Sequence, residues 1–456
     1  MTDLRIHPQT GPLVGSVPVP SDKSIGHRAL ILGAIASGKS LIEGATFGED
    51  NRSTQAALEG LGVRFEPAER GDGLLVHGRG LFGLVAPNAP LDCGNSGTTM
   101  RLLAGLLAGQ SFRSELVGDA SLSRRPMRRI VEPLRARGAR IDGVPHPTKE
   151  GERLPPLVID GLGEDAYLGP LELDSPIASA QVKSAALLSG LLAHGPTYVR
   201  EPQVSRDHTE RMLEAVGVPV RCMGAIVELD PSGWDGRIRP LEMRLPGDLS
   251  AAAFVLAAAA LVPSSRVTVR GVGINPTRTG FLEVLRDMGA GLSIEPRAFS
   301  GGEPVGDVHA WAEVLSSARV GGELLVRAID EVPILCALAA RASGTSSIRD
   351  AEELRVKESD RVRAMADTLR AFGVSCEELP DGLRIVGTDA PLRAADVASG
   401  GDHRVAMTGC VLGLVADGPT TVRDVDCIRT SFPRFVGTLR ALGARIEVVA
   451  ADSSMH

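Results

Sequence analysis

The chain has 456 residues, of which 43% are hydrophobic, 23% charged and only 3% aromatic, and its formal net charge is −7. This length exceeds what one hydrophobic core usually serves, so we expect two domains of globular composition. Few aromatic rings and a negative net charge argue against nucleic acid as a partner. The longest apolar run, 251–262, is shorter than the roughly 20 residues of a membrane-spanning helix.

Two helix patterns alternate along the chain. The first is an Ala- and Leu-rich helix, apolar on nearly all sides, which predicts a buried helix followed by a small-residue turn and a strand. The second is a helix that ends at a glycine, where the left-handed conformation can close it. In chain order the two patterns occur at 29–38, 58–62, 98–109, 134–138, 183–195, 213–217, 250–263, 285–289, 332–344, 369–373, 405–418 and 439–443.

The alternation defines six repeats of roughly 70 to 85 residues, the usual size of an α/β module. Six repeats in two domains predict three repeats per domain, with a ligand cleft between the domains. The six cysteines are scattered and include no Cys-x-x-Cys pair, which indicates reduced, mostly buried thiols in a cytoplasmic protein.

One segment matches a nucleotide-binding motif, but the predicted elements on either side of it do not fit that motif. Gly33 to Ser40 matches the P-loop pattern G-x-x-x-x-G-K-[ST]. A P-loop needs a strand before it and a helix after it, so that the helix N-terminus faces the phosphates. Here an apolar helix precedes the motif and a strand follows it, so we predict an ordinary helix end.

Polar and basic residues gather where the buried helices begin. A helix N-terminus offers free N–H groups and a positive dipole, and adjacent Lys or Arg adds charge, although each cluster alone could be plain N-capping. Two further clusters, 121–129 and 354–361, are rich in arginine and in mixed charges, and Asp330 starts a buried helix that could face the second one. The helix-start clusters lie at 21–28, 92–101, 179–183 and 401–404.

These clusters resemble the motifs of the 5-enolpyruvylshikimate-3-phosphate synthase family across essentially the whole chain. The motifs are Ser-Asp-Lys-Ser-x-x-His-Arg at 21–28, Gly-Asn-Ser-Gly-Thr-Thr-Met-Arg at 94–101, Gly-Asp-Ala-Ser-Leu-Ser-Arg-Arg-Pro at 118–126, Ala-Ser-Ala-Gln-Val-Lys at 178–183, Ser-Arg-Asp-His-Thr-Glu at 205–210, Arg-Val-Lys-Glu-Ser-Asp-Arg at 355–361, Asp-His-Arg at 402–404 and Thr-Ser-Phe-Pro at 430–433.

The resemblance implies an α/β fold of two inverse α/β-prism domains, each of three βαβαββ units, with the active site in the interdomain cleft. It places residues 1–20 and 246–456 in a discontinuous domain on the phosphoenolpyruvate side, and 21–245 in a second domain on the shikimate 3-phosphate side. The implied reaction moves the 1-carboxyvinyl group of phosphoenolpyruvate to the 5-hydroxyl of shikimate 3-phosphate, in chorismate biosynthesis. It implies no cofactor, no metal and a monomer.

The resemblance also implies roles for individual residues. Lys23, Asp330 and Glu358 are the expected catalytic residues, and which of them moves each proton stays open. Residues expected to bind shikimate 3-phosphate are Lys23, Ser24, Arg28, Ser179, Ala180, Gln181, Ser205, Arg206, Asp330 and Lys357. Residues expected on the phosphoenolpyruvate side are Lys23, Gly97, Arg125, Gln181, Arg361, Arg404 and Arg429.

Some positions indicate a divergent bacterial branch. Arg429 stands where a lysine often precedes the Thr-Ser-aromatic-Pro motif, Leu102 stands where some members have Pro, and Glu353 stands where some have Asn. Gly97 is kept, whereas glyphosate-tolerant members of that branch can carry Ala. We therefore expect glyphosate, which occupies the phosphoenolpyruvate site, to bind.

Two alternatives stay open at this point. A sister enolpyruvyl transferase acts on UDP-N-acetylglucosamine with Lys-Asn near its N-terminus and a mobile catalytic cysteine. Here Ser24 follows Lys23, and Cys93 is predicted to be buried. A non-catalytic anion-binding scaffold is the second alternative, although acid–base groups among the cations argue against it.

Overall fold

The computed structural model describes residues 2–69, 71–163 and 166–450. Its chain divides into two compact units: Met1–Pro20, Pro246–Ala298 and Pro304–His456 form the first unit, and Ser21–Leu245 with Phe299–Glu303 form the second. Residue 1 and residues 451–456, at the ends of the first predicted domain, lie outside the described residues. Segment 299–303, which the sequence placed in the first domain, groups with the second unit because buried Glu303 lies 2.8 Å from Nδ1 of His208.

Among the described residues, each unit contains three four-stranded sheets, and these six sheets share one topology. An edge strand pairs in parallel with the next strand, which pairs antiparallel with a third, and the fourth is antiparallel to the third. In the second unit the sheets are β14 (Glu242–Arg244), β3 (Lys39–Glu43), β5 (Leu74–His77), β4 (Arg64–Pro67); β6 (Leu91–Asp92), β7 (Ser114–Val117), β9 (Arg153–Asp160), β8 (Arg140–Pro145); and β10 (Leu171–Asp174), β11 (Thr197–Arg200), β13 (Ile226–Leu229), β12 (Val220–Met223).

The first unit repeats this arrangement. Its sheets are β2 (Val14–Pro18), β15 (Arg266–Gly273), β17 (Val305–Trp311), β16 (Gly291–Pro296); β18 (Arg319–Val320), β19 (Thr345–Ile348), β21 (Gly382–Val386), β20 (Ser375–Leu379); and β22 (Asp396–Ala398), β23 (Thr420–Arg423), β1 (Thr2–Ile6), β24 (Ile446–Ala450). The predicted fold class, two α/β domains of three βαβαββ units each, is therefore confirmed.

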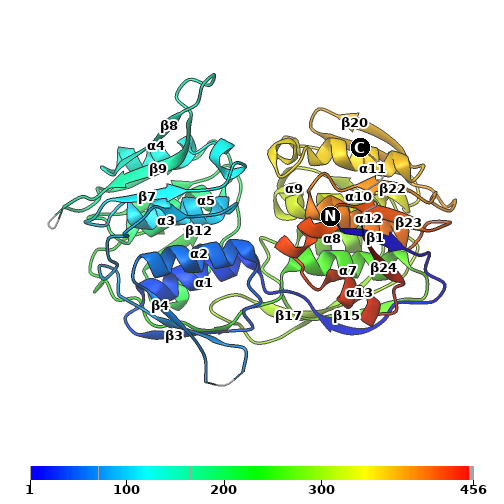
Figure 1. Ribbon diagram of the computed structural model, residues 1–456, viewed down its shortest axis with the longest axis horizontal. Helices are drawn as coiled ribbons and strands as arrows, with labels where there is room; N and C mark the ends of the chain where they lie inside the picture. Colours follow the sequence, from blue (N-terminus) through cyan, green and yellow to red (C-terminus); the bar gives the residue numbers. More distant parts are fainter. Residues whose placement is uncertain (1, 70, 164–165, 451–456) are drawn as a thin grey trace. The chain divides into compact units, whose positions relative to one another are not determined.

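Two sets of helices accompany the sheets (Figure 1). The apolar helices are buried as predicted, and in the first unit α7, α10 and α12 contact one another. The buried set comprises α1 (Lys23–Ile35), α3 (Gly97–Leu107), α5 (Ala180–Gly190), α7 (Leu249–Leu261), α10 (Val332–Ala340) and α12 (His403–Gly413). The outer set comprises α2 (Glu49–Gly60), α4 (Arg128–Ala136), α6 (His208–Ala215), α8 (Gly280–Asp287), α11 (Arg361–Ala371) and α13 (Phe435–Ala441).

Shorter helical segments complete the description. Helix α9 (Gly322–Ala328) leads into the 3-10 turn η2 (Ile329–Glu331), which places Asp330 just before α10. The other 3-10 turns are η1 (Leu122–Arg124), η3 (Glu352–Val356) and η4 (Val425–Thr430). Within the described residues, no helix is long and apolar enough to cross a membrane.

Glycine closes every outer helix, as the repeat pattern predicted. The second residue after each helix end has positive φ, between 78° and 108°, where other residues would be strained. These residues are Gly62, Gly138, Gly217, Gly289, Gly373 and Gly443. Glycine also allows close packing of α3 on α5, which lie side by side in Figure 1. A Cβ at Gly105 would lie 2.4 Å from the carbonyl oxygen of Ala185, so a larger residue does not fit there.

The interpretation of the P-loop match as a helix end is confirmed. Gly33 lies inside helix α1, and Ser40 lies in strand β3. A helix therefore precedes the motif and a strand follows it. Gly38, between them, serves a turn with φ of 145°.

Candidate active site

In the second unit the first two turns of α1, α3 and α5 are joined by hydrogen bonds. Arg101 of α3 donates from Nη1 to Oε1 of Gln181 on α5 at 2.5 Å, and Gln181 donates from Nε2 to Thr98 at 2.9 Å. Arg28 of α1 donates from Nη2 to Ser184 on α5 at 2.7 Å. Three buried helix N-termini, each with a partial positive charge, therefore lie together.

Lys23 lies at the start of α1 next to a carboxylate that the motifs did not identify. Its Nζ donates to Oδ2 of Asp50 on α2 at 2.9 Å. Burial would raise the pKa of Asp50, but the Lys23 ammonium outweighs burial and lowers it. Buried His27 contacts Thr54 through Nδ1 at 2.7 Å, and burial lowers its pKa to about 3, so it is neutral.

The hydrogen bonds of buried Arg28 go to uncharged oxygen atoms, while the carboxylates of Glu210, Asp22 and Glu303 act on its charge from farther away. It donates from Nε to the Thr209 hydroxyl at 2.6 Å, from Nη1 to the Ser24 carbonyl at 2.9 Å, and from Nη2 to Ser184. Burial lowers the pKa of Arg28 to about 10, so it still carries its charge at neutral pH. A guanidinium whose hydrogen-bond partners are neutral is suited to bind an anionic ligand.

Gly97 and Arg125 lie together, as their shared assignment to the phosphoenolpyruvate side requires. Arg125 donates from Nη2 to Oδ1 of Asn95 at 2.6 Å. A Cβ at Gly97 would lie 2.9 Å from Nη1 of Arg101 and 3.3 Å from Nη1 of Arg125. The absence of a side chain at Gly97 therefore leaves room for the two guanidinium groups beside the start of α3.

Ser179, Ala180 and Gln181 start helix α5 and are half-buried, and Ser205 is buried nearby. Ser179 and Ser205 both donate hydrogen bonds to Glu201, a residue outside the predicted set. Arg206 is half-buried in the same loop.

In the first unit, Asp330 lies between two buried arginines. Its carboxylate oxygens are 3.9 Å from Nη1 of Arg278 and 3.8 Å from Nη1 of Arg361. Arg278 also contacts Glu331 at 3.3 Å and donates to Ser250 at 2.8 Å, and Ser250 is hydrogen-bonded to Glu331. Asp330 is thus fixed at the start of α10 by two cations.

Glu358, which precedes helix α11, is paired with Arg361, the first residue of that helix. Arg361 Nη2 donates to Glu358 Oε2 at 2.6 Å, and its Nε donates to Oδ2 of buried Asp402 at 2.8 Å. Burial would raise the pKa of Asp402, but Arg361 outweighs burial and lowers it. The two predicted proton-transfer carboxylates, Asp330 and Glu358, therefore contact the same guanidinium.

The remaining predicted residues of the first unit differ in their surroundings. Arg404 donates from Nη1 to the backbone oxygen of Asp330 at 2.6 Å, which links α12 to the start of α10. Lys357 donates to Glu353 at 2.6 Å. Arg429 is exposed in η4, a segment that contacts α12.

The residues predicted to bind phosphoenolpyruvate belong to both units, and so do those predicted to bind shikimate 3-phosphate. Lys23, Gly97, Arg125 and Gln181 of the phosphoenolpyruvate set lie in the second unit, although the sequence assigned that substrate to the other domain. Asp330 and Lys357 of the shikimate 3-phosphate set lie in the first unit.

Plain N-capping accounts for part of several motifs. Asp22 accepts from the N–H of Ile25, Ser96 from that of Thr99, and Asp402 from that of Arg404. Ser179 differs, because its side chain makes no such bond to α5 in the described structure. The motif residues therefore include capping residues and, in Ser179, a residue whose side chain does not cap its helix.

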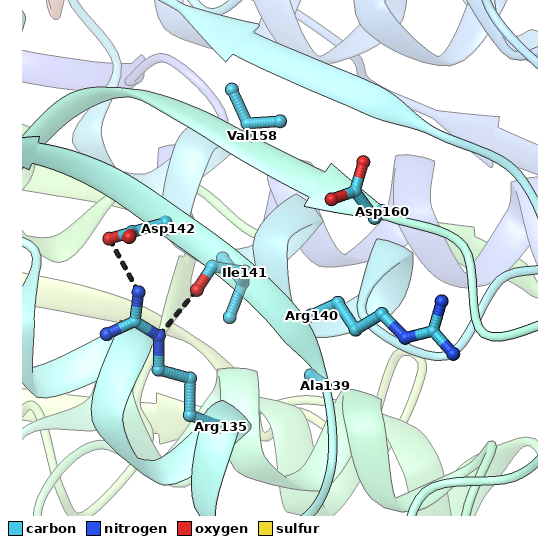
Figure 2. A pocket seen from close by; sticks show the side chains of 7 residues that line it. All are labelled: Arg135, Ala139, Arg140, Ile141, Asp142, Val158 and Asp160. Carbon is cyan, nitrogen blue, oxygen red and sulfur yellow. Dashed lines mark hydrogen bonds and ion pairs between the residues drawn. The ribbon is translucent and has the colours of Figure 1, made fainter.

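A shallow pocket of about 280 Å³ lies away from all predicted site residues (Figure 2). It is lined by residues of α4, β8 and β9. Arg135 donates to the Ile141 carbonyl at 2.7 Å and pairs with Asp142 at 2.6 Å, as the dashed lines in Figure 2 show. Arg135 and Asp142 are therefore paired within the wall, whereas Asp160 pairs with Arg113 outside it at 3.4 Å. The pocket carries none of the acid–base groups of the helix-start clusters.

The cysteine prediction is partly confirmed. Cys93, Cys336 and Cys410 are buried, but Cys376 and Cys427 are half-buried and Cys222 is exposed. Burial raises the pKa of Cys93 to about 12, so its thiol is not ionised at neutral pH. A mobile cysteine nucleophile, which the sister transferase would need, does not fit this buried thiol.

Several site residues were not predicted. Asp50, Glu201 and Arg278 contact predicted residues from distant parts of the chain, and no local pattern marks them. Arg101 and Asp402 did lie inside quoted motifs, where their charge beside a helix start was the signal.

Cations at helix starts together with buried carboxylates define an enzyme that acts on anionic substrates. A sequence model of EPSP synthase (3-phosphoshikimate 1-carboxyvinyltransferase) matches residues 8–439. The 3-phosphoshikimate 1-carboxyvinyltransferase of Geobacter sp. strain M21 is 48% identical over 429 residues, which are 93% of this chain and 96% of that protein. That of Synechococcus sp. strain JA-3-3Ab is 47% identical over 440 residues, 96% of each chain.

Solved structures agree with these sequence matches. EPSP synthase from Acinetobacter baumannii is 41% identical and superimposes with a TM-score of 0.88, covering 99% of this chain and 100% of that one. The chain therefore belongs to the EPSP synthase family.

Proposed function

We propose that Lys23, Asp330 and Glu358 carry out the reaction of this family in this chain. As a member, the chain is an enzyme of aromatic amino acid biosynthesis that transfers the 1-carboxyvinyl group to shikimate 3-phosphate. The 5-hydroxyl oxygen bonds to the enol carbon of phosphoenolpyruvate while the methylene carbon gains a proton. Phosphate then leaves, and the new methyl group loses a proton to restore the double bond.

The addition needs a base for the hydroxyl and an acid for the methylene carbon. The observation that supports Asp330 and Glu358 in these roles is their shared contact with Arg361, at 3.8 Å and 2.6 Å. Two carboxylates beside one buried guanidinium are held close together, where one can take a proton and the other can give one. Lys23, paired with Asp50, adds a cation at the start of α1.

Binding roles follow the two residue sets. We propose that the neutral partners of Arg28 leave its charge for the substrate's phosphate, and that the room at Gly97 serves phosphoenolpyruvate with Arg125. The proposal includes Ser24, Ser179, Ala180, Gln181, Ser205, Arg206 and Lys357 for shikimate 3-phosphate, and Gln181, Arg361, Arg404 and Arg429 for phosphoenolpyruvate. We also propose that the enzyme is a cytoplasmic monomer and needs neither a metal nor a nucleotide.

Phosphate release tests the proposal. The purified chain, treated with EDTA and given no nucleotide, is expected to release phosphate only when shikimate 3-phosphate and phosphoenolpyruvate are both present. Asp330→Asn should lower kcat by about a hundredfold or more, because a carboxamide cannot act as a base. Wild-type enzyme that stays silent with both substrates would refute the proposal, and turnover with UDP-N-acetylglucosamine instead would indicate the sister activity.

A further inference from the structure

The second unit contains a buried group of three ionisable side chains to which the sequence analysis gave no role in the reaction. Lys183, in the second turn of α5, places Nζ 2.8 Å from Oε2 of Glu201 and 2.9 Å from Oε1 of Glu210. Each of the three side chains is at most 3% exposed. An ammonium among buried carboxylates is unusual, because removing either kind of charge from water is costly unless it is paired.

The two carboxylates of this group have different surroundings. Burial raises the pKa of Glu210, which favours its neutral form. Burial also acts to lower the pKa of Lys183, but Glu210 and Glu201 outweigh burial and raise it, so Lys183 remains an ammonium. Glu201 differs from Glu210 in that it also accepts hydrogen bonds from Ser179 and Ser205.

Glu201 anchors two serines of the proposed phosphate-binding set. The backbone N–H of Ser179 donates to Glu201 Oε1 at 2.6 Å. The Ser205 hydroxyl donates to both Glu201 oxygens, at 2.9 and 2.7 Å. Lys183 completes the connection by donating to the Ser205 backbone oxygen at 3.3 Å. One carboxylate thus fixes the start of α5 against the loop that carries Ser205.

Anchoring through its backbone leaves the Ser179 side chain uncommitted to its own helix. Ser96, at the start of α3, uses its hydroxyl to cap the helix, whereas the hydroxyl of Ser179 makes no capping bond to α5. A carboxylate close to a phosphate site would repel the phosphate if its charge were not compensated. Lys183 supplies the compensating charge from inside the protein.

We propose that Glu201 and Lys183 are positioning residues of the phosphate-binding part of the shikimate 3-phosphate site. Glu201 fixes Ser179 and Ser205, and Lys183 neutralises Glu201 so that the substrate's phosphate is not repelled. The inference rests on the proposed function, since that function assigns the two serines to the phosphate.

Steady-state kinetics of three variants test this inference. Lys183→Met leaves Glu201 charged and should raise the KM for shikimate 3-phosphate about 30-fold, with the KM for phosphoenolpyruvate within about twofold of wild type. Glu201→Gln keeps the size of the side chain but weakens its hydrogen bonds to Ser179 and Ser205. It should raise the KM for shikimate 3-phosphate about fivefold. The double variant should fall near Glu201→Gln, because no uncompensated charge remains.

Arg137→Met is the matched control, because Arg137 follows helix α4 and places another buried charge against helix α5. Arg137 is buried toward the other end of α5, where Nη1 donates to Ser189 at 2.6 Å and to the Ala186 carbonyl at 3.1 Å. It should lower the melting temperature and leave both KM values unchanged. A purely structural role for Lys183 would give the same result as this control.

The outcomes separate this inference from the proposed function. If wild-type enzyme releases no phosphate, the proposed function fails and this inference fails with it. If wild type is active but folded Lys183→Met keeps its KM for shikimate 3-phosphate within about twofold, only the inference is overturned. Should Lys183→Met fail to fold, the isosteric Glu201→Gln decides, and an unchanged KM there overturns the inference.

Discussion

The two units share one sheet topology, yet they treat their arginines differently. In the second unit Arg28 donates to two hydroxyls and a carbonyl, all uncharged. In the first unit Arg361 contacts Asp402, Glu358 and Asp330, and Arg404 contacts the backbone of Asp330. The same fold therefore presents a cation with neutral partners in one unit and cations already paired with carboxylates in the other.

This difference indicates a division of chemical tasks. A cation whose hydrogen bonds go to neutral groups gains a directly hydrogen-bonded counter-ion when an anion binds, so it contributes to affinity. Carboxylates held by buried cations are in place before any ligand arrives, so they are suited to proton transfer. The comparison predicts that replacing an arginine of the second unit mainly weakens substrate binding, whereas replacing one of the first unit mainly disturbs the carboxylates that it holds.

Replacing the two arginines tests this contrast most directly. Arg361→Gln leaves buried Asp402 without its main counter-ion and should cost about 3 to 5 kcal/mol of unfolding free energy. Arg28→Gln should cost only about 1 kcal/mol, because Ser184 and Thr209 remain hydrogen-bonded to each other at 2.6 Å. Urea unfolding of both variants measures these costs, and equal losses would contradict the contrast.

A property shared by both units gives a second prediction. His27 and His403 are buried at helix starts, and burial lowers the pKa of each to about 3, against 6.5 in the unfolded chain. Between these values the unfolded chain binds protons that the folded chain excludes, so stability falls as pH drops below 6.5. Each histidine should cost about 2 kcal/mol between pH 7 and pH 5.

His27→Gln should remove one of these two contributions, which urea unfolding at pH 7, 6 and 5 would show as a shallower pH dependence. The same replacement at exposed His194 is the control and should leave the slope as in wild type. An unchanged slope in His27→Gln would show that His27 is protonated in the folded protein.

The smallest effect is expected at Gly97. The added Cβ of Gly97→Ala would meet the ends of two flexible side chains, Arg101 and Arg125, so stability should change by less than about 1 kcal/mol. Displacing these guanidiniums should raise the KM for phosphoenolpyruvate about fivefold and weaken inhibition by glyphosate. Gly437→Ala, where the added Cβ has no neighbour within 4 Å among the described residues, is the control. Unaltered glyphosate inhibition in Gly97→Ala would contradict the prediction.

Much of the fold was predictable because each module repeats a local signal. The glycine after each outer helix and the apolar faces of the buried helices depend on residues close together in sequence, so six modules could be recognised. The discontinuous first domain came only from the family resemblance. The grouping of residues 299–303 with the second unit was not predicted, because it depends on a contact between His208 and Glu303, which are far apart in the sequence.

The candidate site shows the same limit. Lys23, Asp330 and Glu358 lie in recognisable motifs, but their partners do not. Asp50 reaches Lys23 from α2, and Arg278 reaches Asp330 from before α8. Lys183 was predicted to belong to a cluster at a helix start, but its two acidic partners, Glu201 and Glu210, were not predicted. Such pairs form only when the modules pack, so a linear pattern does not reveal them.

The way the chain passes from one unit to the other has a consequence for protein engineering. It leaves the first unit at Pro20 and returns at Pro246, and the N–H of Asp248 donates to the Pro20 carbonyl at 2.8 Å. The second unit is therefore an insert with adjacent attachment points, the arrangement that tolerates circular permutation and split expression. A fragment of residues 21–245 would lack Glu303, the partner of His208. If the two units are expressed as separate chains, the chain of the second unit therefore has to include residues 299–303.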